Sequence, residues 1–226
     1  MKLGVFGGTF DPIHRGHMHI ARHAQNLFGL SQIHFVVATS PPHKRAGDLG
    51  PFSLRFAMVS LATSRFPSFI PSLIELEPPR SPYSIHTLGK LARGSSRAPR
   101  DLFFIAGGDS LLEVSNWREG GKLLSSYSFI FVSRPGVEDQ DPARVLPRRV
   151  VSRVRDLRGL GRRQARREIR LEERASQNRI FLVDLSAPDI SASRIRSLVF
   201  AGRRIQHLVP VPVGQYIRKL HLYGDR

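Results

Sequence analysis

The sequence of 226 residues contains no cysteine, a single tryptophan and no apolar run long enough to cross a membrane. Without cysteine there are no disulfide bonds and no thiolate metal sites, which fits a reducing compartment. The first residues do not form a secretory signal, because Lys2 is followed by only a few apolar residues before a glycine pair. We therefore expect a cytoplasmic protein with no membrane partner, and the length suits a single domain over residues 1–226.

Acidic residues are also scarce, since 18 Asp and Glu stand against 35 Lys and Arg, for a net charge of +17. Such a charge attracts polyanions, either nucleotides or nucleic acid. Residues 141–179 hold 13 arginines and five acidic residues, so this segment alone carries a net charge of +8. The remainder is still basic, as a protein that handles two phosphorylated substrates could be.

The most informative stretch is residues 4–17, which read GVFGGTFDPIHRGH. A short apolar strand runs into Gly7 and Gly8, and a helix is predicted to begin near His14. A strand, a glycine turn and a helix N-terminus bind phosphate through backbone N–H groups and the helix dipole. His14 and His17 are three residues apart, so they share one face of the helix and can donate to phosphate oxygens. The stretch therefore predicts a phosphate site.

Along the rest of the chain, segments with the hydrophobic pattern of a helix alternate with short apolar runs typical of buried strands. This alternation predicts an α/β fold with a doubly wound, mostly parallel sheet. Ser84 and Ser191 are both expected to act as helix N-caps. The predicted strands cover residues 3–6, 33–38, 69–76, 102–106, 127–133 and 179–183. The predicted helices cover 15–29, 52–65, a segment that begins after Ser84, 120–125 and two C-terminal segments.

Several polar side chains follow the predicted strands, at the edge where open α/β sheets bind ligands. Lys44 lies in a proline-containing loop after the second strand, where it could meet an anion or remain a solvated surface residue. Gly107 and Asp109 follow the central strand, and a carboxylate in that position suits ribose hydroxyls. Trp117 offers a flat face for a heteroaromatic ring, although a core role is an equal alternative.

A second helix N-terminus lies near the end of the chain. Ser191 precedes an amphipathic helix whose first turn contains Ser193 and Arg196. A helix dipole, a hydroxyl and a guanidinium together form a potential anion site. Taken alone, the same pattern also suits an ordinary capped basic helix.

Two of these motifs resemble a known family. GGTFDPIHRGH resembles the GxFxPxHxGH signature of the nucleotidyltransferase superfamily, in the version found in bacterial nicotinate-nucleotide adenylyltransferases. ISASRIR resembles their second signature, ISxTxxR, with Ser193 in place of Thr. The segment SPYSIHT is similar to their SYTxDT element but departs from it at Pro82, Ser84 and His86. The His86 substitution puts in doubt any role carried over from the Asp that is common there.

The resemblance covers roughly residues 3–136 and 180–224 and implies a Rossmann-like fold with a C-terminal helical segment. It implies transfer of the adenylyl group of ATP to nicotinic acid mononucleotide, which gives nicotinic acid adenine dinucleotide and pyrophosphate. Positioning and charge stabilisation dominate such transfers, so no protein nucleophile is required. The implied cofactor is Mg²⁺ bound with ATP, and we expect no dedicated protein metal site.

The resemblance also assigns roles to single residues. The implied catalytic residues are His14, His17 and Arg196. The implied ATP-binding residues are Gly7, Gly8, Thr9, Phe10, His14, His17, Gly107, Asp109, Ser193 and Arg196, and the implied mononucleotide-binding residues are Lys44, Tyr83, Thr87 and Trp117.

The arginine-rich segment at about residues 137–179 does not read as a normal continuation of an α/β fold. It is either a solvated helical insertion or an arm that binds RNA or a partner subunit, and its lack of aromatic residues argues against base stacking. We expect no nucleic-acid partner. Alternative substrates are nicotinamide mononucleotide and phosphopantetheine, and the sequence leaves nicotinate or nicotinamide preference and the oligomeric state open.

Overall fold

The computed structural model describes residues 1–41, 49–95, 97–133, 141–173, 177–185 and 188–224. Its strands are β1 (Leu3–Gly8), β2 (Gln32–Val37), β3 (Phe69–Ser72), β4 (Leu102–Gly107), β5 (Ser128–Val132), β6 (Val154–Asp156) and β7 (Ile180–Val183). Its helices are α1 (Arg15–Phe28), α2 (Phe52–Thr63), α3 (Ser84–Gly94), α4 (Asp109–Glu113), α5 (Gly120–Ser126), α6 (Pro142–Val145), α7 (Arg148–Val151), α8 (Arg162–Glu173), α9 (Ala192–Phe200) and α10 (Val211–Lys219), with short 3₁₀ turns at Pro99–Asp101 and Val114–Asn116.

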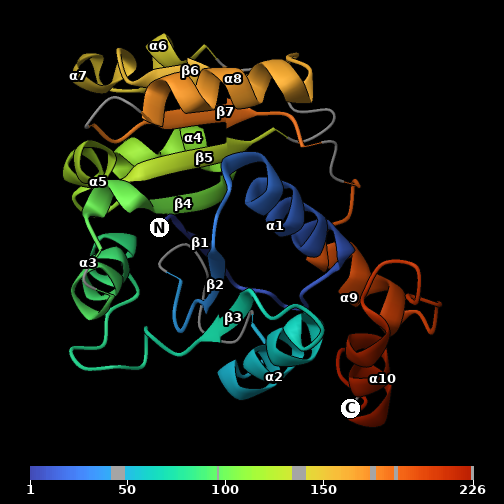
Figure 1. Ribbon diagram of the computed structural model, residues 1–226. Coiled ribbons are helices and arrows are strands. Elements are labelled where there is room, and N and C mark those ends of the chain that lie inside the picture. Colours follow the sequence, from blue (N-terminus) through green and yellow to red (C-terminus); the bar gives the residue numbers. More distant parts are fainter. Residues whose placement is uncertain (42–48, 96, 134–140, 174–176, 186–187, 225–226) are drawn as a thin grey trace.

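The strands form one parallel sheet in the order β3-β2-β1-β4-β5-β7-β6, with helices on both faces (Figure 1). This confirms the predicted α/β, doubly wound architecture. From β1 the chain winds through β2 to β3 on one side, and then returns to β4 on the other side of β1. The carboxyl ends of β1 and β4 therefore flank the switch point, which is where such sheets bind ligands.

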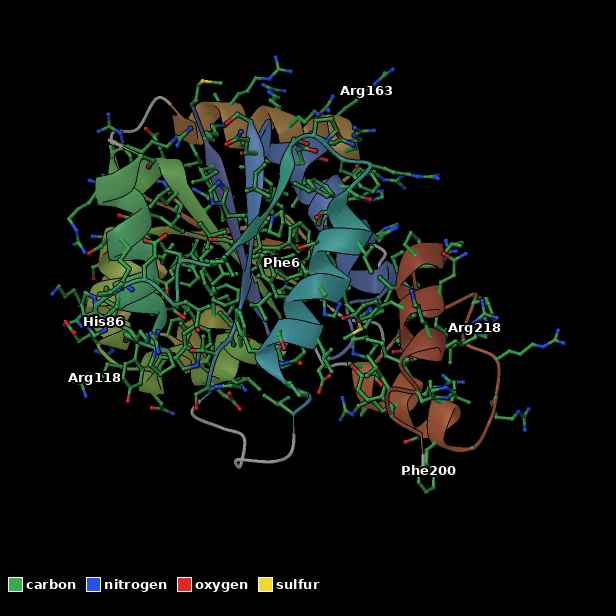
Figure 2. The ribbon with its side chains drawn as sticks, turned by 90° about the horizontal axis from the view of Figure 1, so that it is seen from below. Phe6, His86, Arg118, Arg163, Phe200 and Arg218 are labelled. Atoms are coloured by element: carbon green, nitrogen blue, oxygen red, sulfur yellow. The ribbon has the colours of Figure 1, made fainter. Side chains whose placement is uncertain are left out.

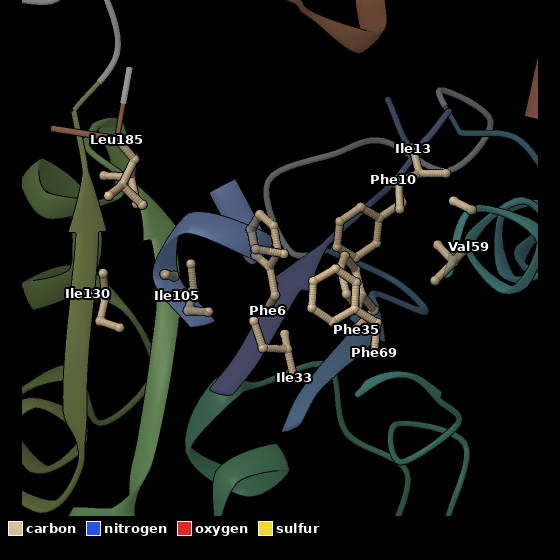
Figure 3. Packing of buried hydrophobic residues seen from close by; sticks show 14 of the residues in the cluster. Phe6, Phe10, Ile13, Ile33, Phe35, Val59, Phe69, Ile105, Ile130 and Leu185 are labelled. Carbon is tan, nitrogen blue, oxygen red and sulfur yellow. The ribbon is translucent and has the colours of Figure 1, made fainter. Parts of the chain in front are cut away.

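Side chains along the strands alternate between two hydrophobic clusters, as the two-residue period of a strand requires. Phe6 and Ile105 pack with α1, α2, α8 and α10, whereas Val5 and Phe104 pack on the opposite face with α3, α5 and α7. Figure 3 shows the first cluster, in which Phe6 and its neighbours on the adjacent strands meet side chains from the segment before α1 and from α2. Each helix layer is thus fixed to the sheet by buried aromatic and aliphatic side chains.

Most predicted elements appear with boundaries shifted by one or two residues, but two details differ. Tyr83 rather than Ser84 occupies the N-cap position of α3, and Ser84 is the first helical residue. The strand predicted over residues 69–76 ends at Ser72, because the chain then turns and the Leu76 N–H donates to the Leu73 carbonyl at 2.8 Å.

The arginine-rich segment differs most from its prediction. It contains β6, an edge strand paired with β7, and α8, whose Ala165 and Ile169 side chains are buried against the sheet. The acid Glu172 of α8 accepts hydrogen bonds from Arg155 of β6 and from Arg179 before β7. The described part of this segment thus continues the α/β layering. Three residues of β6 are too few to give a periodic signal in the sequence.

The C-terminal helices α9 and α10 lie beside α1 and α2, at one end of the molecule (Figure 1). Ser191 is the N-cap of α9, as predicted, and its Oγ accepts from the Arg194 N–H at 3.2 Å. Within the described ranges, no helix has the length and apolar character needed to cross a membrane.

Candidate active site

The first helix N-terminus of the site is that of α1. His14 is the N-cap residue, with extended backbone, and its N–H donates to Nδ1 of His17 at 3.2 Å. The two imidazole rings stack with centroids 3.7 Å apart and planes 26° apart. The structure therefore brings the two predicted histidines together at the start of α1, directly after the carboxyl end of β1.

The ring of Phe10 packs against His17 from the side of the hydrophobic core. Its φ of 48° lies in the left-handed region, its side chain is only 1% exposed, and its ring meets that of His17 edge-on at 5.0 Å. In Figure 3 its ring lies in the hydrophobic cluster next to Phe35. A Cβ atom on Gly8 would lie 3.0 Å from the Phe10 ring, so this packing requires glycine there. The side chain of Phe10 thus belongs to the core and packs on His17, and the predicted ATP contact of this residue stays a prediction.

The second helix N-terminus is that of α9. Its exposed Ser193 carries a hydroxyl 3.3 Å from the Ser191 hydroxyl, at the open end of the helix. Arg196, one turn further on, donates from Nη1 to the backbone carbonyl of Asp11 at 2.7 Å. Because a guanidinium has five N–H donors, this bond leaves others for a ligand.

The two helix N-termini lie next to each other. Asp11 is in the segment between β1 and α1, so the Arg196 hydrogen bond joins that segment directly to α9. A Cβ atom on Gly16, in the first turn of α1, would lie 3.5 Å from the carbonyl oxygen of Pro188, just before α9. Two segments from opposite ends of the sequence therefore contact each other at the switch point of the sheet.

Three buried polar residues and one partly buried tyrosine beneath this site were not identified from the sequence. They are Asp11, Arg55 on α2, Glu75 after β3 and Tyr223 near the C-terminus. Asp11 is 1% exposed, and its carboxylate accepts from the Gly50 N–H at 3.0 Å and from the Tyr223 hydroxyl at 2.6 Å. The sequence feature that could have indicated them is Arg55, a single arginine on the apolar face of the helix predicted over residues 52–65. A buried arginine requires hydrogen-bond or charge partners inside the protein.

Arg55 is the largest fully buried side chain of the described residues. Its Nη1 donates to the carbonyls of Thr9 and Ala38, both at 2.8 Å, and its Nε donates to the carbonyl of Gly50 at 2.8 Å. Burial lowers the pKa of Arg55, and the negative charge of Asp11 opposes that shift. One side chain thus connects the loops that follow β1 and β2 with the start of α2.

Glu75 completes this group. Its Oε2 accepts from both the N–H and the hydroxyl of Thr39, at 2.8 and 3.1 Å. Burial raises the pKa of Glu75, and the bonds from Thr39 and the charges of Lys90 and Arg55 partly offset that effect. The residues that follow β2 are therefore held by a carboxylate as well as by Arg55.

On the other side of the switch point, β4 ends at Gly107, and Asp109 begins α4 in an exposed position. The Gly108 N–H donates to the Val132 carbonyl at 2.7 Å, which fixes the turn to the end of β5. Phe104 of β4 meets Trp117 edge-on at 6.0 Å. The structure therefore places Trp117 on the α3 and α5 side of the sheet, opposite the histidines.

Tyr83 lies in this second region, where the guanidinium carbon of Arg118 is 5.3 Å from its ring centroid. Thr87 is one turn further along α3 and only 3% exposed, and its hydroxyl donates to the Tyr83 carbonyl at 3.4 Å. The hydroxyl donor of Thr87 is thus used within α3, and its predicted contact with the substrate stays a prediction.

His86 occupies the position that is often Asp in the family it resembles. Its Nδ1 is 2.7 Å from the hydroxyl of Ser81, and its Nε2 is 4.0 Å from a carboxylate oxygen of Glu119. Figure 2 shows His86 and Arg118 at the same corner of the molecule, far from Phe200 and Arg218 at the C-terminal helices. A neighbouring carboxylate is thus supplied by Glu119 rather than by residue 86.

Two predictions about charged groups, a phosphate contact of Lys44 and the lack of a dedicated metal site, stay predictions. Lys44 lies outside the described residues, between Pro41 and Asp48 of the chain, so its contact with a phosphate stays a prediction. In the part of the chain that the structure describes, no group of three or more His, Asp or Glu side chains is arranged to hold a metal ion.

Comparisons with known proteins agree with this arrangement. The model of the cytidylyltransferase-like family matches residues 5–198. A protein of Geobacter metallireducens named probable nicotinate-nucleotide adenylyltransferase is 38% identical over 223 residues, which cover 99% of this chain and 98% of that protein. A protein of Pelobacter propionicus with the same name is 38% identical over 226 residues, which cover 100% of this chain and 99% of that protein.

Solved structures agree with the fold. The nicotinic acid mononucleotide adenylyltransferase of Plasmodium falciparum, complexed with NaAD, superposes with a TM-score of 0.69 at 17% identity and covers 98% of this chain and 97% of its own. The same protein complexed with APC gives a TM-score of 0.67 at 16% identity, with 98% and 96% covered. At these identities the likeness concerns the fold alone.

Proposed function

The chain belongs to the cytidylyltransferase-like family and, within it, to the nicotinate-nucleotide adenylyltransferases, and from this membership we propose the reaction and the roles of its residues. The protein transfers the adenylyl group of ATP to nicotinic acid mononucleotide, giving nicotinic acid adenine dinucleotide and pyrophosphate. The observation that carries this function is the contact between the N-termini of α1 and α9, which supplies two phosphate-binding helix ends in one site.

In the reaction, an oxygen of the mononucleotide phosphate attacks the α-phosphorus of ATP. A new P–O bond forms as the bond between the α-phosphorus and the bridging oxygen breaks, and pyrophosphate leaves with that oxygen. The chain contributes position and charge stabilisation, which dominate phosphoryl-type transfer.

His14 and His17 are placed to act on the transferring α-phosphate. Their rings are stacked at the positive end of α1, so a bound phosphate meets imidazole donors and helix N–H groups together. Ser193 and the remaining N–H groups of Arg196 are placed to bind the β- and γ-phosphates as they leave. Gly7 and Gly8 can contribute only backbone groups, and Thr9 and Phe10 are proposed to bind ATP beside them.

The mononucleotide would occupy the opposite side of the switch point. Tyr83 and Trp117 supply aromatic surfaces there, and Asp109 supplies a carboxylate for ribose hydroxyls. The indole Nε1 of Trp117 is buried and has no hydrogen-bond partner among the described residues, so a substrate acceptor would satisfy it. Lys44 would meet the phosphate.

Mg²⁺ is proposed to enter with ATP. This ion prefers phosphate oxygens and water, and it typically uses few protein ligands. When bound, it would neutralise charge on the phosphates, while the protein groups described above hold them in place.

The names of the full-length relatives favour nicotinic acid mononucleotide and give no support to phosphopantetheine or to an RNA-binding role. The absence of cysteine supports a cytosolic location, which stays a proposal.

The test is to incubate purified protein with ATP, Mg²⁺ and either nicotinic acid mononucleotide or nicotinamide mononucleotide, and to measure dinucleotide and pyrophosphate. We expect both products in equal amounts, with faster turnover of the nicotinic acid substrate. If neither mononucleotide gives dinucleotide, the proposed function is wrong.

A further inference from the structure

Below the proposed phosphate site lies a buried polar network whose members come from four separate parts of the chain. Asp11 precedes α1, Arg55 lies on α2, Glu75 follows β3, and Tyr223 lies beyond α10. Asp11 and Arg55 are 1% and 2% exposed, and Glu75 is 8% exposed. We call these four residues the buried tie.

Asp11 is the centre of the tie, because each of its oxygen atoms serves a different segment. Oδ1 accepts from Tyr223, Oδ2 accepts from the Gly50 N–H, and the main-chain carbonyl accepts from Arg196. The C-terminal segment, the start of α2 and the first turns of α9 therefore all bond to one residue of the loop that carries His14.

Arg55 connects the same loop to the carboxyl end of β2. Its guanidinium joins the carbonyls of Thr9, Ala38 and Gly50. Thr9 precedes the histidines, whereas Ala38 and Gly50 flank the segment that follows β2. The planar guanidinium presents several N–H donors in fixed directions and can therefore bond to three carbonyls at once. A lysine ammonium cannot reproduce this arrangement in full.

Net stability does not explain why these charges are buried. Taking charged groups out of water is costly, and well-packed apolar residues of similar volume often give equal or greater stability. The bonds of the tie instead fix the position of the loop between β1 and α1, because Thr9 and Asp11 of that loop are bonded to Arg55, Gly50, Arg196 and Tyr223. In-line transfer is sensitive to such positions, and a misplacement of about 1 Å costs about a hundredfold in rate.

We propose that Asp11, Arg55 and Tyr223 are positioning residues of the transfer reaction, which hold the loop that carries His14 and His17 in place without touching either substrate. The proposal rests on the adenylyltransferase function argued above. Loosening the tie leaves each substrate able to bind, but it spreads the positions of His14 and His17 relative to the transferring α-phosphate. The loss therefore appears in kcat more than in KM.

The first test replaces Tyr223 by Phe, which keeps the ring and removes only the hydroxyl that donates to Asp11. The matched control is Tyr216→Phe on α10, whose hydroxyl has no hydrogen bond to any described residue. We expect Y223F to lower kcat by about tenfold, less than the roughly hundredfold loss typical of a full 1 Å misplacement, and Y216F to keep the wild-type value.

The second test replaces Arg55 by Lys, which keeps the positive charge but removes the planar guanidinium and its several N–H donors. Its control is Arg65→Lys, an exposed residue just beyond α2. We expect R55K to lower kcat at least about tenfold, and the double variant R55K/Y223F to lose less than the product of the two single losses, because Arg55 and Tyr223 both hold the loop that contains Thr9 and Asp11. Kinetics are measured well below each variant's unfolding midpoint, so that only folded enzyme is compared.

A kcat within twofold of wild type in folded Y223F overturns the proposal, whatever happens to its melting temperature. If R55K does not fold, Y223F and its control still decide the question. The wild-type assay distinguishes failure of the positioning role from failure of the proposed function. If the wild type forms no dinucleotide, the proposed function is wrong. If the wild type is active and the variants are unaffected, only the positioning role of the tie is wrong.

Discussion

Arg196 donates a hydrogen bond to the backbone carbonyl of Asp11 at 2.7 Å, although 185 residues separate them in the sequence. This bond joins the first turns of α9 to the loop that leads into α1. Each of these helix N-termini carries partial positive charge and unsatisfied N–H groups. Their contact is what allows one triphosphate to be held from two sides, and the first two predictions below depend on it.

His17→Ala is expected to lower turnover about a hundredfold, which is the scale for losing a preorganised donor to a transition-state charge. His17 is stacked on His14 and supported by Phe10, so its ring has a fixed orientation before substrate arrives. The measurement is steady-state pyrophosphate release. His23→Ala on the same helix is the control, and near-wild-type turnover of H17A would remove His17 from the mechanism.

Ser193→Thr is expected to change kcat and KM for ATP by less than about twofold, because the hydroxyl is kept and the position is exposed. Ser193→Ala is expected to raise KM for ATP by about fivefold to tenfold, since one phosphate donor is lost. Both values come from initial rates at varied ATP. A large loss in S193T would mean that the first turn of α9 is more crowded than its exposure indicates.

The fold was predictable where an apolar run and the residues that bound it both indicate the same element. The apolar runs that became β1, β2, β4 and β5 are bounded by glycines, prolines or helix caps, and they gave the parallel sheet directly. In contrast β6 has three residues, Val-Arg-Asp, and it is a strand only because β7 lies next to it.

The site was predictable as a set of motifs but not as a set of contacts. The sequence identified His14, His17, Ser193 and Arg196, because short motifs at helix ends carry their own geometry. It did not indicate that the Phe10 side chain lies in the core, because a motif does not tell whether a side chain points to the site or to the core. The buried tie was missed because its members meet only through tertiary packing.

Glu172→Gln is expected to lower the free energy of unfolding by about 1–3 kcal/mol at neutral pH. Burial raises the pKa of Glu172, but the bonds from Arg179 and Arg155 outweigh it, and the net shift is downward. The variant leaves two partly buried guanidiniums without their anion. Urea unfolding measures the loss, with Glu168→Gln on the same helix as control, and equal midpoints for both variants would show that the ion group adds nothing.

His34→Gln is expected to weaken the acid sensitivity of folding. Burial lowers the pKa of His34 below its usual 6.5, with a smaller effect from the charge of Arg97. Above about pH 6.5 the residue is neutral in both states, and as the pH falls below that value the unfolded state gains a proton first, so stability is lost. Urea unfolding at about pH 7.5 and about pH 5.5 should show a smaller decrease for H34Q than for wild type. An identical decrease would assign the effect to other groups.

The most direct test is a crystal structure of the protein with a non-hydrolysable ATP analogue and Mg²⁺. We expect phosphate oxygens within hydrogen-bond distance of His17 at the start of α1 and, in the same molecule, of Ser193 and Arg196 at the start of α9. A triphosphate bound at only one of these helix ends, with the other facing solvent, would contradict the account.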